Sequence, residues 1–133
     1  MTEQEQTDQN FMKLALEQGQ LAYDAGEVPV GAVVVLDGQV IGRGYNKPIT
    51  SLDPSAHAEV VALRDAALNI GNYRLANAVL YVTVEPCTMC LGLLVHSRIA
   101  RLVYGTTEPK SGVIESAMCL LEQPFYNHKI EIT

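Results

Sequence analysis

Hydrophobic positions recur at regular spacing along most of this 133-residue chain. In the N-terminal segment, apolar side chains return every three or four positions, as on one face of an α-helix: Phe11, Leu14, Leu21, Ala22 and Ala25. The pattern predicts a helix from about Asp8 to Ala25, and Gly26 is a suitable stop signal.

Two short apolar runs then predict a β-hairpin. Strand-forming residues fill Gly31–Leu36 and Val40–Tyr45, and Asp37-Gly38 between them is a strong hairpin-turn signal. We therefore expect these strands to be antiparallel neighbours. Gly42-Arg43-Gly44 is only a fragment of a dinucleotide-binding fingerprint, so we interpret it as strand glycines or a bulge.

The remaining chain alternates between predicted helices and strands. A polar loop over Asn46–Ser55 leads into a helix that begins at His57 and ends near Gly71. The later elements expected are a strand (Val79–Val84), a helix (Cys87 to about His96), a strand (Ile99–Gly105), a loop (Thr106–Gly112), a short helix (Glu115–Leu121) and a strand (His128–Ile132). This order predicts a three-layer α/β/α fold whose five-stranded mixed sheet starts with a hairpin and is otherwise largely parallel.

Composition limits the class of protein. With 48% hydrophobic and 18% charged residues, the chain is neither disordered nor fibrous, and its length suits one domain over residues 1–133. The first ten residues lack the basic start and apolar stretch of a secretory signal, and no apolar run approaches membrane-spanning length. We therefore expect a soluble cytoplasmic protein with no membrane partner.

The net charge of -6 argues at first against a nucleic-acid partner, because phosphates favour basic surfaces. However, residues 1–30 contain six acids and one lysine, so residues 31–133 carry a net charge of only -1. Four basic side chains flank one predicted strand: His96, Arg98, Arg101 and Lys110. They either create a local positive potential or form an ordinary solvated surface.

Three cysteines do not make a disulfide framework. Cys87 and Cys90 are spaced i, i+3, so on one helix both sulfurs reach the same metal ion. Pro86 suits the first turn of such a helix, and the helix N-terminus favours both thiolates. A thioredoxin-like redox pair is the alternative for a lone CxxC. We expect Cys119 to be a buried small apolar side chain.

His57 supplies a third potential ligand, and Glu59 supplies a carboxylate that need not bind the metal. A catalytic zinc takes three protein ligands and keeps one position for water, whereas a structural zinc normally takes four. The pattern requires His57 and Glu59 to lie at or near a helix start. The order H-x-E followed by P-C-x-x-C is the signature of zinc nucleobase deaminases, and a redox pair would leave His57 and Glu59 unexplained.

Segments outside these motifs carry a family resemblance. The chain resembles bacterial tRNA-specific adenosine deaminases, of the cytidine deaminase superfamily, over about residues 10–133, with matching segments at Glu27–Ala32, Asp53–Glu59, Asn72–Leu75, Leu80–Cys90, His96–Ile99 and Asn127-His128. The resemblance implies a cytidine-deaminase-like fold, a homodimer, and conversion of adenosine to inosine at the wobble position of a tRNA anticodon stem-loop.

The resemblance also implies residue roles. His57, Cys87 and Cys90 would hold Zn²⁺, which lowers the pKa of a water to about 7, while Glu59 would carry its proton to the purine and then to the departing ammonia. Asn46 matches the residue that contacts the target base, although a loop-capping role is an equal alternative. Lys110 matches a residue of the loop near the nucleic acid.

The sequence departs from the family pattern in two places. Thr106–Pro109 replaces a segment that more often reads small residue, Arg, Asp, Ala, and the sequence ends at Thr133, where family members usually continue into a helix that helps hold the stem-loop. Two other functions therefore stay open. One is a guanine or free-nucleoside deaminase with the same zinc site, and the other is a non-catalytic zinc-binding module.

Overall fold

The computed structural model describes residues 1–126 and 128–133. In chain order its elements are α1 (Glu3–Asp24), β1 (Gly31–Leu36), β2 (Gln39–Tyr45), α2 (Pro48–Ser51), α3 (Ala58–Ile70), β3 (Val79–Val84), α4 (Thr88–His96), β4 (Arg101–Thr106), a 3-10 turn η1 (Leu120–Glu122) and β5 (Glu131–Ile132). Helices thus alternate with strands as the hydrophobic pattern predicts.

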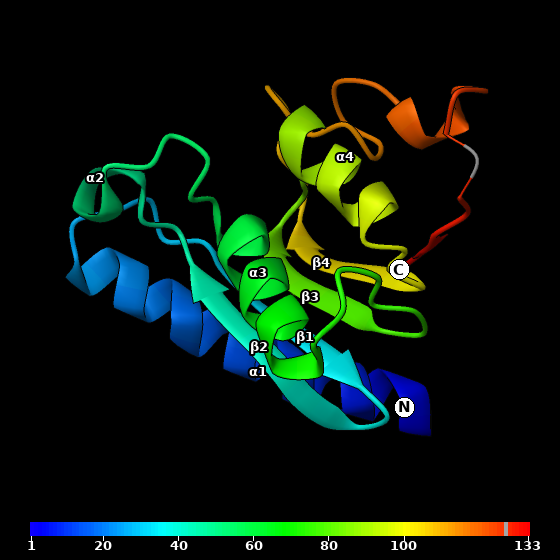
Figure 1. Cartoon of the computed structure of the whole chain (residues 1–133), viewed down its shortest axis with the longest axis horizontal. Helices are drawn as coiled ribbons and strands as arrows, with labels where there is room; N and C mark the ends of the chain where they lie inside the picture. The colour runs from blue at the N-terminus through cyan, green and yellow to red at the C-terminus, as the bar shows by residue number, and fades with distance from the viewer. Residues whose placement is uncertain (127) are drawn as a thin grey trace.

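The described strands form one five-stranded mixed sheet in the order β2-β1-β3-β4-β5. β1 is antiparallel to both β2 and β3, whereas β3, β4 and β5 are parallel to one another. Figure 1 shows α3 and α4 on the near side of this sheet and α1 behind it. The three-layer α/β/α arrangement is therefore confirmed, while the antiparallel β1–β3 pair is a departure from the largely parallel sheet expected after the hairpin.

Each face of the sheet has its own apolar core, because side chains alternate between faces along a strand. Val34, Leu80 and Val82 pack with Leu91 and Leu94 of α4, in a core that also takes in α3. On the opposite face, α1 packs against β1, β3 and β4 through a second core of Ala15, Val33, Val35, Tyr81 and Val103. None of the helices in the described part of the chain is both long and apolar enough to cross a bilayer.

The hairpin is formed as its sequence predicts. Asp37 and Gly38 have φ values of 51° and 77°, the left-handed pair that a tight two-residue turn requires. A register shift between Val34 and Val35 places a bulge in β2. Gly42 and Gly44 lie against the backbone of α3, where any Cβ atom would collide with it. The interpretation of these residues as strand glycines is confirmed, and their reason is close packing of α3 on β2.

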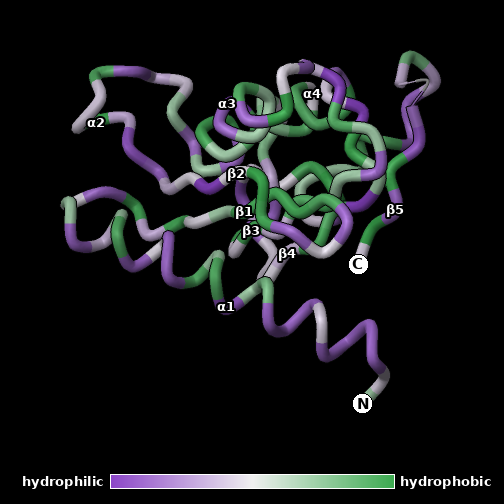
Figure 2. The backbone as a smooth tube through the Cα atoms, turned by 60° about the horizontal axis from the view of Figure 1, so that its bottom comes forward, coloured by the Kyte–Doolittle hydropathy of each residue, from purple (hydrophilic) through white to green (hydrophobic). Residues whose placement is uncertain are grey.

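α1 begins at Glu3, five residues before the predicted start at Asp8. The Thr2 hydroxyl accepts a hydrogen bond from the Glu5 amide (3.1 Å), so it caps the helix, and Glu3 and Glu5 favour its positive end. The hydrophobic pattern missed this turn because its residues are polar, as Figure 2 shows for the N-terminal end of the tube. The acidic segment is therefore helical.

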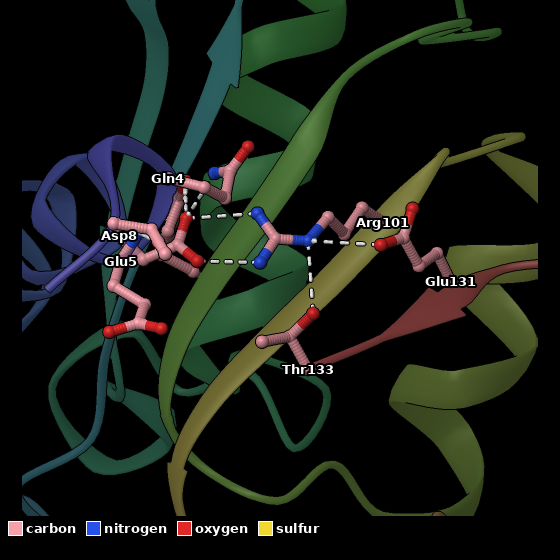
Figure 3. Close-up of polar contacts among 8 residues, drawn as sticks. Gln4, Glu5, Asp8, Arg101, Glu131 and Thr133 are labelled. Atoms are coloured by element: carbon pink, nitrogen blue, oxygen red, sulfur yellow. Dashed lines mark hydrogen bonds and ion pairs between the residues drawn. The ribbon is translucent and has the colours of Figure 1, made fainter.

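An ion pair ties this end of α1 to the start of β4 (Figure 3). The Arg101 guanidinium donates to both carboxylate oxygens of Asp8, at 2.9 and 2.5 Å, and both side chains are close to 90% buried. The Tyr81 hydroxyl donates to the same carboxylate (2.7 Å), and the Arg101 Nε donates to the Thr133 hydroxyl (3.0 Å). α1, β3, β4 and the chain end are thus joined by one polar cluster.

The C-terminal third differs most from prediction. The helix expected over Glu115–Leu121 is wrong, since turns fill this segment up to η1, and β5 covers only two of the residues predicted as strand. The loop Asn46–Ser55 contains the short helix α2. Cys119 is exposed, so its prediction as a buried apolar side chain is wrong. The backbone of α2 and of the turns before η1 is held by hydrogen bonds to polar groups, which a pattern of hydrophobic residues does not reveal.

Candidate metal centre

Both halves of the H-x-E and P-C-x-x-C pattern lie at helix starts. His57 is the N-cap of α3 and Cys87 is the N-cap of α4, both with extended backbone, and Glu59 lies in the first turn of α3. Pro86 therefore precedes the N-cap and is not inside the first helical turn as expected. Cys90 is the third residue of α4, and its side chain is fully buried.

The three candidate ligands meet at one point. His57 Nδ1 lies 3.6 Å from Cys87 Sγ and 3.5 Å from Cys90 Sγ, and the three ligand atoms all lie within 4.8 Å of one another. Tetrahedral zinc with ordinary bond lengths places its nitrogen and sulfur ligands about 3.6 Å apart. One imidazole and two thiols in this arrangement therefore fit a Zn²⁺ ion with one coordination position left for a small ligand.

The two thiols share their proton unequally. A hydrogen bond from Cys90 lowers the pKa of the Cys87 thiol to about 5. The same hydrogen bond, together with burial, raises the pKa of the Cys90 thiol. The pair thus holds one negative charge by itself, and a divalent cation between the sulfurs would favour the thiolate of both.

Glu59 lies beside this cluster, and its side chain is only 4% exposed. Burial is the main cause that raises the pKa of its carboxyl, and the neighbouring Cys87 acts in the same direction. A carboxyl with a raised pKa is suited to take up and release a proton near neutral pH. Its place in the first turn of α3 also agrees with the requirement set by the sequence.

A cavity of about 260 Å³ opens directly onto the cluster. It is lined by Val28, Val30, Asn46, His57, Glu59, Val84, Glu85, Cys87, Glu108 and Ser111. The structure therefore brings Asn46 to the same cavity as His57 and Glu59. Lys110 is exposed and lines a neighbouring cavity, which shares Cys87 and Ser111 with the first.

Two buried carboxylates, which the sequence reasoning missed as site residues, hold the loops around this cavity. Glu27 accepts hydrogen bonds from the Ile49 amide (3.3 Å) and from the amide and hydroxyl of Thr50 (2.7 and 2.9 Å), so it fixes α2. Glu85 accepts hydrogen bonds from the loop after β4. The available signal was one acid beside each of two strongly apolar strands, Glu27 before β1 and Glu85 directly after β3, where a buried charge is costly without partners.

The basic side chains around β4 do not form one positive patch. Arg101 is paired with Asp8 and approaches Glu131 (3.8 Å), so its charge is compensated. His96 is exposed, and it lines a groove between α3 and α4 rather than the metal centre. His128 Nε2 donates to the Ile99 carbonyl (2.8 Å), and Asn127 lies outside the described residues.

Comparison with known proteins agrees with this geometry. Residues 5–106 match the family described as the cytidine and deoxycytidylate deaminase zinc-binding region. The chain is 50% identical to a tRNA-specific adenosine deaminase of Haemophilus influenzae over 127 residues, which cover 95% of this chain and 73% of that protein. The chain belongs to the tRNA-specific adenosine deaminases of the cytidine deaminase superfamily.

A second relative supports the assignment, and two solved structures show the fold. The Bacillus subtilis tRNA-specific adenosine deaminase is 41% identical over 125 residues, covering 94% of this chain and 78% of that protein. A solved structure from a study of A-to-I editing by tRNA:A34 deaminases superposes with a TM-score of 0.91 at 44% identity, covering 94% of this chain and 91% of that one. The structure of Bacillus subtilis guanine deaminase superposes with a TM-score of 0.73 at 39% identity, covering 80% of this chain and 66% of that one. The cytidine-deaminase-like fold is confirmed.

Proposed function

We propose that this chain deaminates adenosine to inosine at the wobble position of a tRNA anticodon, with Zn²⁺ held by His57, Cys87 and Cys90. The observation that carries the proposal is the spacing of 3.5 and 3.6 Å between the His57 nitrogen and the two sulfurs, next to a buried carboxyl. A closed structural site would need a fourth protein ligand, and the cluster in the described residues has three.

Each side chain has a separate part in this reaction. Zn²⁺ at this site would supply hydroxide near neutral pH by lowering the pKa of a water. Glu59 takes the proton of that water and passes it to the purine ring nitrogen next to the amino-bearing carbon, which makes this carbon more electrophilic. Hydroxide adds to this carbon, Glu59 moves the proton of the added hydroxyl to the amino group, and the C–N bond breaks to release ammonia as the carbonyl of inosine forms. The roles require Glu59 to stay off the metal.

Asn46 and Lys110 are proposed to bind the substrate. The cavity of about 260 Å³ is at or below the lower end of the range of roughly 300–1,000 Å³ usual for drug-sized ligands, so it suits one base that has left its stack. Asn46 lines this cavity, and its amide can donate to and accept from a purine edge. Lys110, which is exposed and lines the neighbouring cavity, would pair with a backbone phosphate.

We further propose that residues 1–133 act as one domain, that two copies form a homodimer, and that the protein works in the cytoplasm. Family membership supports the tRNA partner, and the homodimer is what the resemblance to this family implies. Sedimentation equilibrium of the purified chain tests the dimer, and a single cooperative unfolding transition tests the one-domain proposal. A mass of 14.5 kDa at all micromolar concentrations would contradict the dimer.

A guanine deaminase is the second candidate function. Two observations favour it: the similarity to the Bacillus subtilis guanine deaminase structure and the acidic isoelectric point of about 4.9, which is unusual for a protein that binds RNA. Guanine carries its amino group beside the same kind of ring nitrogen, so the metal site and Glu59 would act in the same way. The choice therefore rests on the cavity and its loops.

Parallel assays on different substrates separate the two functions. The zinc-loaded protein is incubated with an adenosine-34 anticodon stem-loop, the same sequence as single-stranded DNA, free adenosine and free guanine. We expect inosine in the RNA stem-loop and turnover of the free purines at least a hundredfold lower in kcat/KM. Conversion of guanine to xanthine with no inosine in the stem-loop would refute the tRNA assignment.

A further inference from the structure

Glu85, the last residue before Pro86-Cys87, has a buried carboxylate that is 3% exposed. Its Oε1 atom accepts a hydrogen bond from the Glu108 amide (3.0 Å) and one from the Ser116 hydroxyl. Its Oε2 atom accepts from the amides of Ile114 (3.0 Å), Glu115 (2.8 Å) and Ser116 (3.1 Å). Five donors thus fill a group with about four lone-pair positions, so none remains for a substrate.

These donors come from the loop that follows β4. The segment from Thr107 to Cys119 contains no helix or strand, so its shape depends on individual hydrogen bonds. Gly112 lies directly against the Glu85 carboxylate, where any Cβ would collide with it. The Ala117 amide donates to the Gly112 carbonyl (2.8 Å) and the Leu120 amide to the Val113 carbonyl (2.9 Å), so these amides do not make the i→i−4 bonds of the helix predicted over Glu115–Leu121. The hydrogen bonds that shape this loop therefore converge on the Glu85 carboxylate.

The loop forms one wall of the substrate cavity. Glu108 and Ser111 line that cavity, and Lys110 lines the neighbouring one. Two backbone hydrogen bonds at the same place fix the loop to the metal-binding segment: the Glu85 amide donates to Thr106 (2.9 Å) and the Val113 amide donates to Pro86 (3.1 Å). Glu85 thus connects the wall of the cavity to Cys87, two residues away.

We propose that Glu85 is a positioning residue that sets the distance between the metal centre and the substrate-binding loop, resting on the deaminase function proposed above. It acts through the loop and does not touch the reacting atoms. Losing the carboxylate frees four amides, so Glu108, Lys110 and Ser111 lose their fixed place relative to the bound base. The cost falls on substrate binding rather than on the metal or on the chemical step.

The test compares Glu85→Gln with wild type in three measurements. Gln keeps the size of the side chain but turns one oxygen into a donor that faces other donors, so at least two loop hydrogen bonds are lost. We expect unchanged zinc content, amide hydrogen exchange at Glu108 and Ile114–Ser116 faster by about tenfold or more, and a KM for the RNA stem-loop raised by about tenfold with kcat within a few-fold of wild type.

Two further variants keep the test decisive. Glu122→Gln changes an exposed acid in η1, just after the same loop, and should leave exchange and KM as in wild type. Ser116→Ala removes one donor, is milder than Glu85→Gln, and should raise KM by a smaller factor. If Glu85→Gln lowers the zinc content or disturbs folding, the KM of Ser116→Ala becomes the deciding measurement. A KM of Ser116→Ala equal to that of wild type would then overturn the proposal.

Failure of the deaminase assignment gives a different result. If wild type leaves the stem-loop unchanged, the proposed function is wrong, and KM is then measured with the purine that wild type converts. The positioning role would be overturned, whichever substrate is used, if the amides of Glu108 and Ile114–Ser116 exchanged in the Glu85→Gln protein at the same rates as in wild type.

Discussion

His57 and Cys87 each stand immediately before a helix, where the backbone is extended and the side chain is free to turn toward a common point. The free amides of a helix start favour a thiolate, so this position both orients the Cys87 side chain and favours its metal-binding, deprotonated form. Glu59 gains its burial from the same helix. The site thus needs only two correctly placed helix starts.

Removal of one ligand should remove the metal. In Cys90→Ala, only one nitrogen and one sulfur remain, so we expect zinc content to fall from about one ion per chain to near zero, with loss of deamination. Metal analysis after dialysis against a weak chelator measures this. Cys119→Ala is the control, since Cys119 is exposed and lies outside the cluster. Full zinc content in Cys90→Ala would contradict the ligand assignment.

The base-contact role of Asn46 is tested by Asn46→Ala. We expect kcat/KM for the stem-loop to fall by about 10- to 100-fold, because an unpaired polar edge of the bound base costs about 1–3 kcal/mol. Zinc content and melting temperature should change little. Asn10→Ala, at an exposed position of α1, is the matched control. Equal kcat/KM in both variants would leave Asn46 with a loop-capping role only.

At the scale of elements, the approach of α3 to β2 fixes the His57 half of the site. Gly44→Ala puts a Cβ into the α3 backbone, so we expect a loss of more than about 2 kcal/mol in the free energy of unfolding. Urea denaturation measures it. Gly92→Ala, in α4 with open space around its Cβ, is expected to be neutral or stabilising by up to about 1 kcal/mol. Similar effects of the two changes would contradict the packing argument.

The docking of α1 should depend on pH through Asp8. The hydrogen bonds from Arg101 are the main cause that holds the pKa of this carboxyl below its usual value of about 3.9. Its contribution to stability is therefore fully present above about pH 4 and is lost as pH falls through the lowered pKa of the folded state. Asp8→Asn should cost about 2 kcal/mol at pH 7, and less below pH 4.

Thermal unfolding of wild type and Asp8→Asn between pH 3 and 7 measures this difference. Asp24→Asn serves as the control, because Asp24 is at the exposed other end of α1, and a change within about 0.5 kcal/mol is expected. A difference between wild type and Asp8→Asn that does not vary with pH would contradict the ion-pair account.

Elements with a strong apolar pattern could be predicted from the sequence. β1, β3 and the Asp37-Gly38 turn occur where the pattern puts them. Elements set by polar groups could not, because an N-cap threonine or a buried carboxylate has no periodicity. Thr2 caps the polar first turn of α1, and Glu85 holds three consecutive amides of the loop after β4.

At the scale of the whole molecule, charge is unevenly distributed. Residues 1–30, mainly α1, carry most of the excess negative charge, and α1 covers the sheet face opposite to α3 and α4, whose starts build the metal centre. Most of the charge behind the acidic isoelectric point therefore lies on the α1 face of the sheet. Sequence alone left two alternatives for the basic side chains around β4, a local positive potential or a solvated surface. It could not show that Asp8, 93 positions away, neutralises Arg101.

We propose that this chain is a zinc enzyme in which Glu59 carries protons and does not bind the metal. Glu59→Gln keeps the size of the side chain and removes its acidity, so it should abolish most inosine formation without lowering the zinc content. We predict wild-type zinc content together with a fall of at least about 10³-fold in inosine formed in the anticodon stem-loop, measured on one protein preparation. Unchanged inosine formation by zinc-loaded Glu59→Gln protein would contradict the account.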